Sequence, residues 1–146
     1  MLFRSAGGKD ALINGISGNN KRYGDREWLG FLGENIVITI EFDKPTNINN
    51  VATRFYNGNG QWIYAPKEIN LQLKLEDGRA ISTRKKIENT KSLLVDFNLN
   101  ISKFSEDKNL KVTELKITIP SYGIIPEGKQ GAGHKAWTFI DEIIIN

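Results

Sequence analysis

Apolar and polar residues alternate with a period of two along most of this chain. The clearest runs are residues 36–42, 69–75 and 115–119, in which every second residue is apolar. Successive side chains of a strand point to opposite faces, so each run predicts a strand with one buried and one solvated face. Weaker patterns predict further strands at residues 48–55, 81–87, 92–98 and 136–145.

Turn-forming residues separate these runs. They are Asp-Lys-Pro at residues 43–45, Asn-Gly-Asn-Gly at 57–60, and Asp77-Gly78, a strong hairpin signal between two strands. No long segment has a helical period, and only residues 97–104 suggest a short helical turn. Seven or eight short strands predict one all-β domain over residues 1–146, built as an antiparallel β-sandwich with less than about 10% helix.

Two long segments interrupt the strand pattern. Residues 6–32 are rich in glycine, asparagine and charge yet contain several aromatic residues, and residues 121–135 form a glycine-rich stretch with the single histidine, His134. Loops longer than about 12–15 residues in a compact domain are usually functional or disordered. The aromatic residues in and beside these loops favour function.

Composition narrows the function classes. Twenty Lys and Arg residues are spread among 17 acids, giving a net charge of +3. The one dense basic cluster, Arg84-Lys85-Lys86, is expected in a solvated hairpin loop, so no nucleic-acid partner is predicted. No apolar run approaches the roughly 20 residues of a membrane span. The N-terminus lacks a signal-peptide pattern and enters patterned sequence directly, which suggests a module excised from a larger protein.

Catalytic chemistry has little support in the sequence. There is no cysteine, no Gly-x-Ser-x-Gly motif, and a lone histidine, which rules out the usual nucleophile and zinc patterns. The adjacent carboxylates Asp141 and Glu142 could be mistaken for a glycosidase pair, but neighbouring side chains of a strand point to opposite faces. Glu142 lies among apolar residues, where it is expected to meet a bound cation or else a lysine or arginine.

The tryptophans are more informative. Trp28, Trp62 and Trp137 each lie at a border between a polar loop and a strand. Aromatic faces pack against the C–H faces of sugar rings, although each tryptophan could instead plug one end of the core. As a group, the aromatic and polar loop residues favour carbohydrate binding.

Three segments resemble the discoidin-like, F5/8 type C modules of the galactose-binding superfamily, in the version appended to bacterial chitobiases and β-hexosaminidases. They are Ala-Leu-Ile-Asn-Gly-Ile at residues 11–16 with Trp-Leu-Gly-Phe at 28–31, Gly-Gln-Trp-Ile-Tyr-Ala-Pro at 60–66, and residues 133–143, which resemble Gly-x-x-Ala-Trp-x-Phe-x-Asp-Glu-Ile. The chain departs from the family at Asn14, where Asp is usual, and at residues 42–45, where the family strand ends in Asp-Leu-Gly.

The resemblance implies an eight-stranded jelly roll that binds carbohydrate without catalysing a reaction and targets a linked glycoside hydrolase to glycans ending in N-acetylhexosamine or galactose. It also implies a bacterial exported protein, a monomeric module, and one structural calcium ion held by Asn14 and Glu142, weakened because Asn14 is uncharged. The alternative is a structural or protein-contact domain that packs against its parent enzyme.

The sugar site is expected where three loops, residues 19–28, 56–62 and 122–137, converge at one end of the sandwich. Trp28 and Trp137 are the residues expected to be buried, and Tyr23, Asn57 and His134 those expected to touch ligand. The full predicted set is Tyr23, Trp28, Tyr56, Asn57, Trp62, His134, Lys135 and Trp137.

Overall fold

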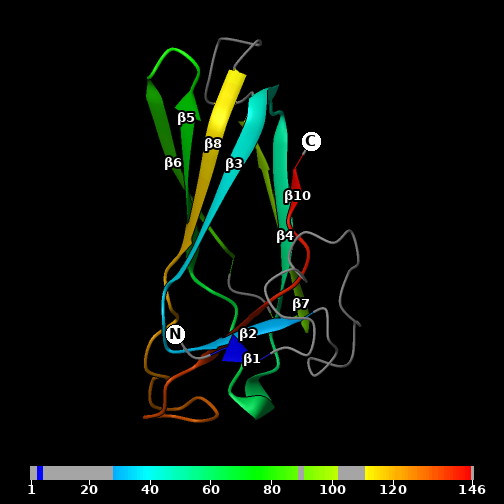
Figure 1. The fold of residues 1–146 in the computed structure, drawn as a ribbon. Coiled ribbons are helices and arrows are strands. Elements are labelled where there is room, and N and C mark those ends of the chain that lie inside the picture. Colours follow the sequence, from blue (N-terminus) through cyan, green and yellow to red (C-terminus); the bar gives the residue numbers. More distant parts are fainter. Residues whose placement is uncertain (1–2, 5–27, 89–90, 102–110, 146) are drawn as a thin grey trace.

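Two antiparallel β-sheets pack face to face in the computed structural model, which describes residues 3–4, 28–88, 91–101 and 111–145 (Figure 1). In the larger sheet, β4 is central and pairs with three other strands. The strands of this sheet are β1 (Phe3–Arg4), β2 (Leu29–Leu32), β9 (Trp137–Ile140), β4 (Asn50–Tyr56), β10 (Ile144–Ile145) and β7 (Leu94–Asn100).

The smaller sheet has the strand order β3-β8-β5-β6. Its strands are β3 (Ile36–Asn47), β8 (Lys111–Ile119), β5 (Glu68–Leu75) and β6 (Ala80–Lys86). A short 3-10 helix, η2 (Asn59–Gln61), follows β4. Among the described residues there is no helix long and apolar enough to cross a membrane. The predicted β-sandwich is therefore confirmed, and eight of the described strands have four residues or more.

The main core lies between the two sheets and follows the period-two pattern. In β5, for example, Ile69, Leu71 and Leu73 are buried, whereas Gln72 and Lys74 are exposed. The predicted Asp77-Gly78 hairpin joins β5 to β6, and the Asp77 carboxylate accepts a hydrogen bond from the backbone N of Arg79 at 2.9 Å. Burial of alternate residues on both sheets gives the sandwich a single continuous core.

Two local predictions were wrong, each because of tertiary pairing. Residues 43–45 lie within β3 at a bulge between Glu41 and Thr46, and β3 is an edge strand, where proline is tolerated. The Arg84-Lys85-Lys86 cluster ends the edge strand β6 and forms no loop; lysines there discourage pairing with another chain. Of residues 97–104, where a short helical turn was predicted, 97–100 belong to β7, Ile101 has a 3-10 conformation, and 102–104 lie outside the described residues.

A second, smaller apolar cluster covers the opposite face of the larger sheet. Phe55 pairs with Ile140 and Tyr56 with Phe139, so alternate residues of β4 and β9 face the main core and this outer cluster. Trp28 packs edge-on against Tyr56, with ring centroids 5.5 Å apart. This outer cluster, completed by Ile63, supports the loops that follow β4.

Gly30 allows the outer cluster to form, because its Cα lies opposite Phe139 and the Phe139 ring lies over its backbone. A Cβ at Gly30 would be 2.5 Å from the Phe139 Cζ. We expect Gly30→Ala to lower the free energy of unfolding by about 1–3 kcal/mol through overpacking, measured by urea denaturation. Gly60→Ala is the matched control, because its Cβ would meet nothing closer than 3.5 Å. An equal loss in both variants would contradict this account.

Candidate functional site

Two of the three loops expected at the site meet at one end of the sandwich. The backbone N of Trp137 donates to the O of Trp62 at 2.8 Å, and the N of Tyr64 donates to the O of Trp137 at 3.0 Å. These bonds join the segment after η2 to the first residue of β9 by a parallel bridge between Ile63 and Trp137. Of the third loop, only Trp28 lies within the described residues, so Tyr23 is outside them.

Trp62 has an unusual backbone conformation for a bulky residue. It follows η2 with φ 62° and ψ 27°, and it is the only non-glycine residue of positive φ in the described part of the chain. For such a residue the left-handed conformation costs about 1–2 kcal/mol. Its side chain is nonetheless 39% exposed. The surrounding contacts therefore fix this residue in place while leaving much of its ring in solvent.

The Trp62 indole is held by the neighbouring loop. The His134 ring stacks on it with centroids 4.3 Å apart and planes 18° apart. Gly131, at φ +84°, lies against the indole so closely that a Cβ there would be 2.5 Å from the Trp62 Cδ1. The N of His134 donates to the O of Gly131 at 3.0 Å, which fixes the turn. We call the Trp62 and His134 rings the aromatic stack.

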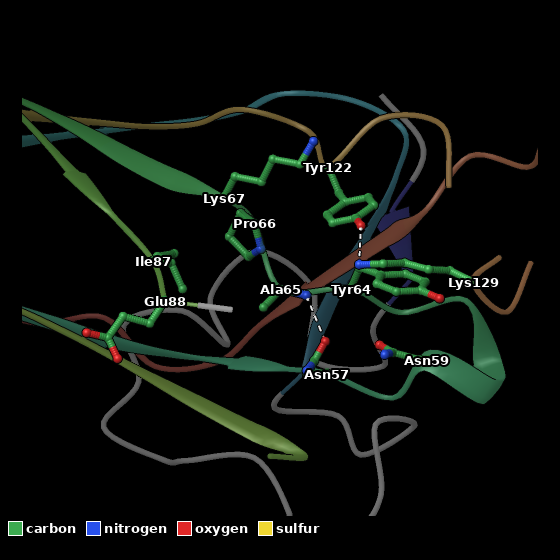
Figure 2. A pocket seen from close by; sticks show the side chains of 10 residues that line it. All are labelled: Asn57, Asn59, Tyr64, Ala65, Pro66, Lys67, Ile87, Glu88, Tyr122 and Lys129. Carbon is green, nitrogen blue, oxygen red and sulfur yellow. Dashed lines mark hydrogen bonds between the residues drawn. The ribbon is translucent and has the colours of Figure 1, made fainter. Parts of the chain in front are cut away.

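A pocket of about 170 Å³ opens at the same end of the molecule (Figure 2). The Tyr64 and Tyr122 rings stack at a centroid distance of 4.8 Å, and the Tyr64 hydroxyl donates to the O of Gln130 at 2.7 Å. Burial raises the pKa of Tyr64 above its ordinary value. The neighbouring Tyr122 raises this pKa further, and the positive charge of Lys129 lowers it; the net rise keeps the hydroxyl protonated as a donor. We call the cavity the tyrosine pocket; Asn57, Asn59, Lys67 and Lys129 also line it.

Asn57 holds the tyrosine pocket together. Its Oδ1 accepts a hydrogen bond from the N of Ala65 at 3.2 Å, and its Nδ2 donates to the O of Ser92 at 3.2 Å. Both ends of the amide thus bond to backbone groups of other segments. Asn57 is one of the residues predicted to touch ligand. In the structure its side chain is already engaged in positioning two loops.

The remaining predicted residues divide into buried and exposed groups. Trp28 is fully buried, as expected for a plug, and Trp137 is half-buried. Ligand contact by Tyr56 or Trp28 does not fit their positions, because both rings belong to the outer cluster and Tyr56 is only 4% exposed. His134, which belongs to the aromatic stack, and Lys135, the next residue of the same loop, are both exposed.

The carboxylates Asp141 and Glu142 lie in the connection between β9 and β10 and not within a strand. The opposite-face argument was therefore wrong, and both residues border one cavity of about 340 Å³. Asp141 is 1% exposed and forms an ion pair with Arg54 at 2.6 Å. The ion pair gives this carboxylate a structural role. A carboxylate held this way by a guanidinium is poorly suited to serve as a glycosidase acid or base.

The expected calcium site falls partly outside the described residues. Asn14 is not among them, whereas Glu142 is buried. Within the described part of the chain, no three His, Cys, Asp or Glu side chains are grouped so that they could hold a metal ion. Since calcium also takes backbone carbonyls, the ion stays a prediction.

Sequence reasoning missed Tyr64, Tyr122 and the lysines of the tyrosine pocket. Tyr64 follows Trp62 by two positions in one quoted motif, and Tyr122 begins one of the expected loops. Their positions in a quoted motif and at the start of an expected loop could therefore have identified the two tyrosines as site residues. Nothing in the sequence distinguishes Lys67 and Lys129 from the other lysines, because lysines are spread throughout the chain.

Comparison with known proteins identifies a fold and no family. No family model matches the sequence, and no curated protein matches it significantly. The chain superposes on a histidine mutant of the lectin binding domain of lectinolysin, complexed with Lewis b, with a TM-score of 0.55, 14% identity, and coverage of 99% of this chain and 88% of that one.

A second solved structure is a carbohydrate-binding module specific for non-crystalline cellulose, CBM28. It aligns with a TM-score of 0.44 and 9% identity, over 99% of this chain and 86% of that one. The superposition on the lectinolysin domain extends over nearly the whole chain and agrees with the two-sheet β-sandwich described above.

Proposed function

We propose that this chain is a non-catalytic carbohydrate-binding module whose sugar site includes the aromatic stack. The observation that carries the proposal is the exposed Trp62 ring, held in a left-handed backbone conformation. Costly conformations persist where the surrounding structure over-determines them, and they gather at functional sites. A ring that is already fixed loses little conformational entropy when a ligand stacks on it.

The chemistry around Trp62 suits a sugar. A sugar ring needs a flat apolar surface for its C–H face and short polar groups for its hydroxyls. The aromatic stack supplies the surface, and the exposed side chains of Asn59, Gln130 and His134 supply hydrogen-bonding groups at the same end of the sandwich. In contrast, Trp28 and Tyr56 support the site from within the outer cluster.

The similarity of fold to the lectinolysin domain, which is complexed with Lewis b, supports the proposal by analogy. Fold similarity alone does not fix function, because one fold serves many functions. The proposal therefore rests on Trp62 and its surroundings, and the analogy adds to it.

The finer proposal follows the sequence resemblance to F5/8 type C modules. On this basis the chain is an exported module of a chitobiase- or β-hexosaminidase-type glycoside hydrolase, with a calcium ion at Asn14 and Glu142. Its ligands end in N-acetylhexosamine or galactose. Tethering makes a weak site useful, because binding of the module turns the enzyme's own encounter with the glycan into an intramolecular step.

Replacement of Trp62 tests the sugar site. Trp62→Gly removes the ring and suits the left-handed backbone, so we expect glycan affinity to fall tenfold or more, about 1.4 kcal/mol, while the free energy of unfolding changes by less than about 1 kcal/mol. A glycan array identifies the ligand, and isothermal titration calorimetry measures its affinity. Trp62→Phe should retain much of the binding. Val37→Ala is the control, because Val37 is 49% exposed on β3 of the other sheet.

The array and the titration separate the possible failures. Glycan binding that is unchanged in Trp62→Gly would show that the sugar binds elsewhere. A full array without any bound glycan would contradict the proposed function and favour a protein-contact domain.

Asn57 should behave differently from Trp62. Asn57→Ala removes two hydrogen bonds to backbone groups, so we expect the free energy of unfolding to fall by about 1–2 kcal/mol in urea denaturation. Asn59→Ala, on the exposed side of the same pocket, should change stability by less than about 0.5 kcal/mol. Equal stability of the two variants would refute the positioning role of Asn57.

A further inference from the structure

Two lysines meet at one aromatic ring in the tyrosine pocket. The Lys129 Nζ donates a hydrogen bond to the Tyr122 hydroxyl oxygen at 3.2 Å, and the Lys67 Nζ lies 4.9 Å from the centre of the Tyr122 ring. Lys129 also lies 5.9 Å from the centre of the Tyr64 ring. Lys67 precedes β5 and Lys129 belongs to the 122–137 loop, so the fold brings them together from distant parts of the chain (Figure 2).

Neither lysine of this pair is neutralised by an ion pair with a carboxylate of the described residues. None of the ion pairs formed among those residues includes Lys67 or Lys129. Glu88 also lines the pocket, but Figure 2 shows its carboxylate at the far side, pointing away from the two tyrosines. Two ammonium groups at one ring repel each other, and a bound anion would relieve that repulsion.

We infer that the tyrosine pocket binds the anionic group of an acidic glycan, while a neighbouring sugar ring packs on the aromatic stack; this rests on the proposed carbohydrate-binding function. The shared chemistry of the ligand is a carboxylate or a sulfate ester on a sugar. Lysine ammonium groups form charge-assisted hydrogen bonds with such oxygens. Tyr122 accepts the bond from Lys129, so its own O–H is available to donate to the anion.

The size of the pocket fits a substituent and not a whole oligosaccharide. Its volume of about 170 Å³ is smaller than the roughly 300–1,000 Å³ of pockets that enclose complete small-molecule ligands. The remainder of the sugar must therefore lie outside the pocket, on the surrounding surface.

The aromatic stack is placed to receive that remainder. Gln130 accepts the Tyr64 hydroxyl bond in the pocket, and the next residue, Gly131, lies against the Trp62 indole. Lys129 and Gly131 are two positions apart, so their Cα atoms lie within about 7 Å of each other. One loop thus contributes both to the cationic pocket and to the packing of the aromatic surface.

The test uses one polysaccharide backbone with and without its charges. Oligosaccharides of unsulfated chondroitin carry carboxylates, those of chondroitin sulfate add sulfate esters, and carboxyl-reduced unsulfated chondroitin is neutral. We expect at least one acidic form to bind the full chain about tenfold more tightly than the neutral form in titration calorimetry at low salt. Raising the ionic strength should remove most of that preference, because both lysines are exposed.

Lysine variants assign the preference to the pocket. Lys67→Met and Lys129→Met keep the aliphatic stem and remove the charge, so each should weaken acidic-glycan binding about three- to tenfold and leave neutral-glycan binding unchanged. The double variant should abolish the preference, and Lys67→Arg with Lys129→Arg should retain it. Lys74→Met, on the exposed face of β5, is the matched control and should have no effect.

The outcomes distinguish this inference from the proposed function. Trp62-dependent binding of neutral and acidic forms with equal affinity would overturn the acidic-glycan inference and leave the proposed function standing. A preference that survives in the double methionine variant would also overturn the assignment to this pocket. Absence of binding to every glycan, on these oligosaccharides and on the array, would overturn both.

Discussion

The position of the candidate site depends on the two backbone hydrogen bonds of Trp137. β9 is fixed in the larger sheet between β2 and β4, and Trp137 is its first residue. Trp137 forms backbone hydrogen bonds with Trp62 and Tyr64, so the loop after η2 is attached to the larger sheet. Backbone groups that would otherwise need water or side-chain partners are satisfied there, so the loop has one defined path.

That path explains how Trp62 can keep an unfavourable backbone conformation. Ile63 and Tyr64, the next two residues, are buried in separate apolar clusters. Burial of an aliphatic side chain such as Ile63 contributes about 1.5–3 kcal/mol, which matches or exceeds the cost of about 1–2 kcal/mol at Trp62. The strain persists because its relief would withdraw the neighbouring side chains from their clusters, and the result is an aromatic ring fixed at the surface.

Charges in this protein occur in two different settings. Arg54 and Asp141 form a pair in which the carboxylate is buried, on the outer face of the larger sheet, where it stabilises the connection to β10. Lys67 and Lys129 instead contact aromatic rings at the rim of an open pocket. In the Arg54–Asp141 pair each charge is satisfied by the other within the protein. The lysines instead leave hydrogen-bond donors facing the pocket for a ligand.

The sequence by itself determined the strands and the two-sheet class, because period-two alternation records which face of each strand is buried, as in β5 and β8. It also determined the Asp77-Gly78 hairpin, whose geometry is local. Burial of Trp28 was also predicted from the sequence, but only the tertiary structure separated the buried Tyr56 from the exposed Trp62, since both occupy similar loop borders. It likewise brought Lys67 and Lys129 to Tyr122, because such contacts depend on which distant segments pack together and not on the residues beside them.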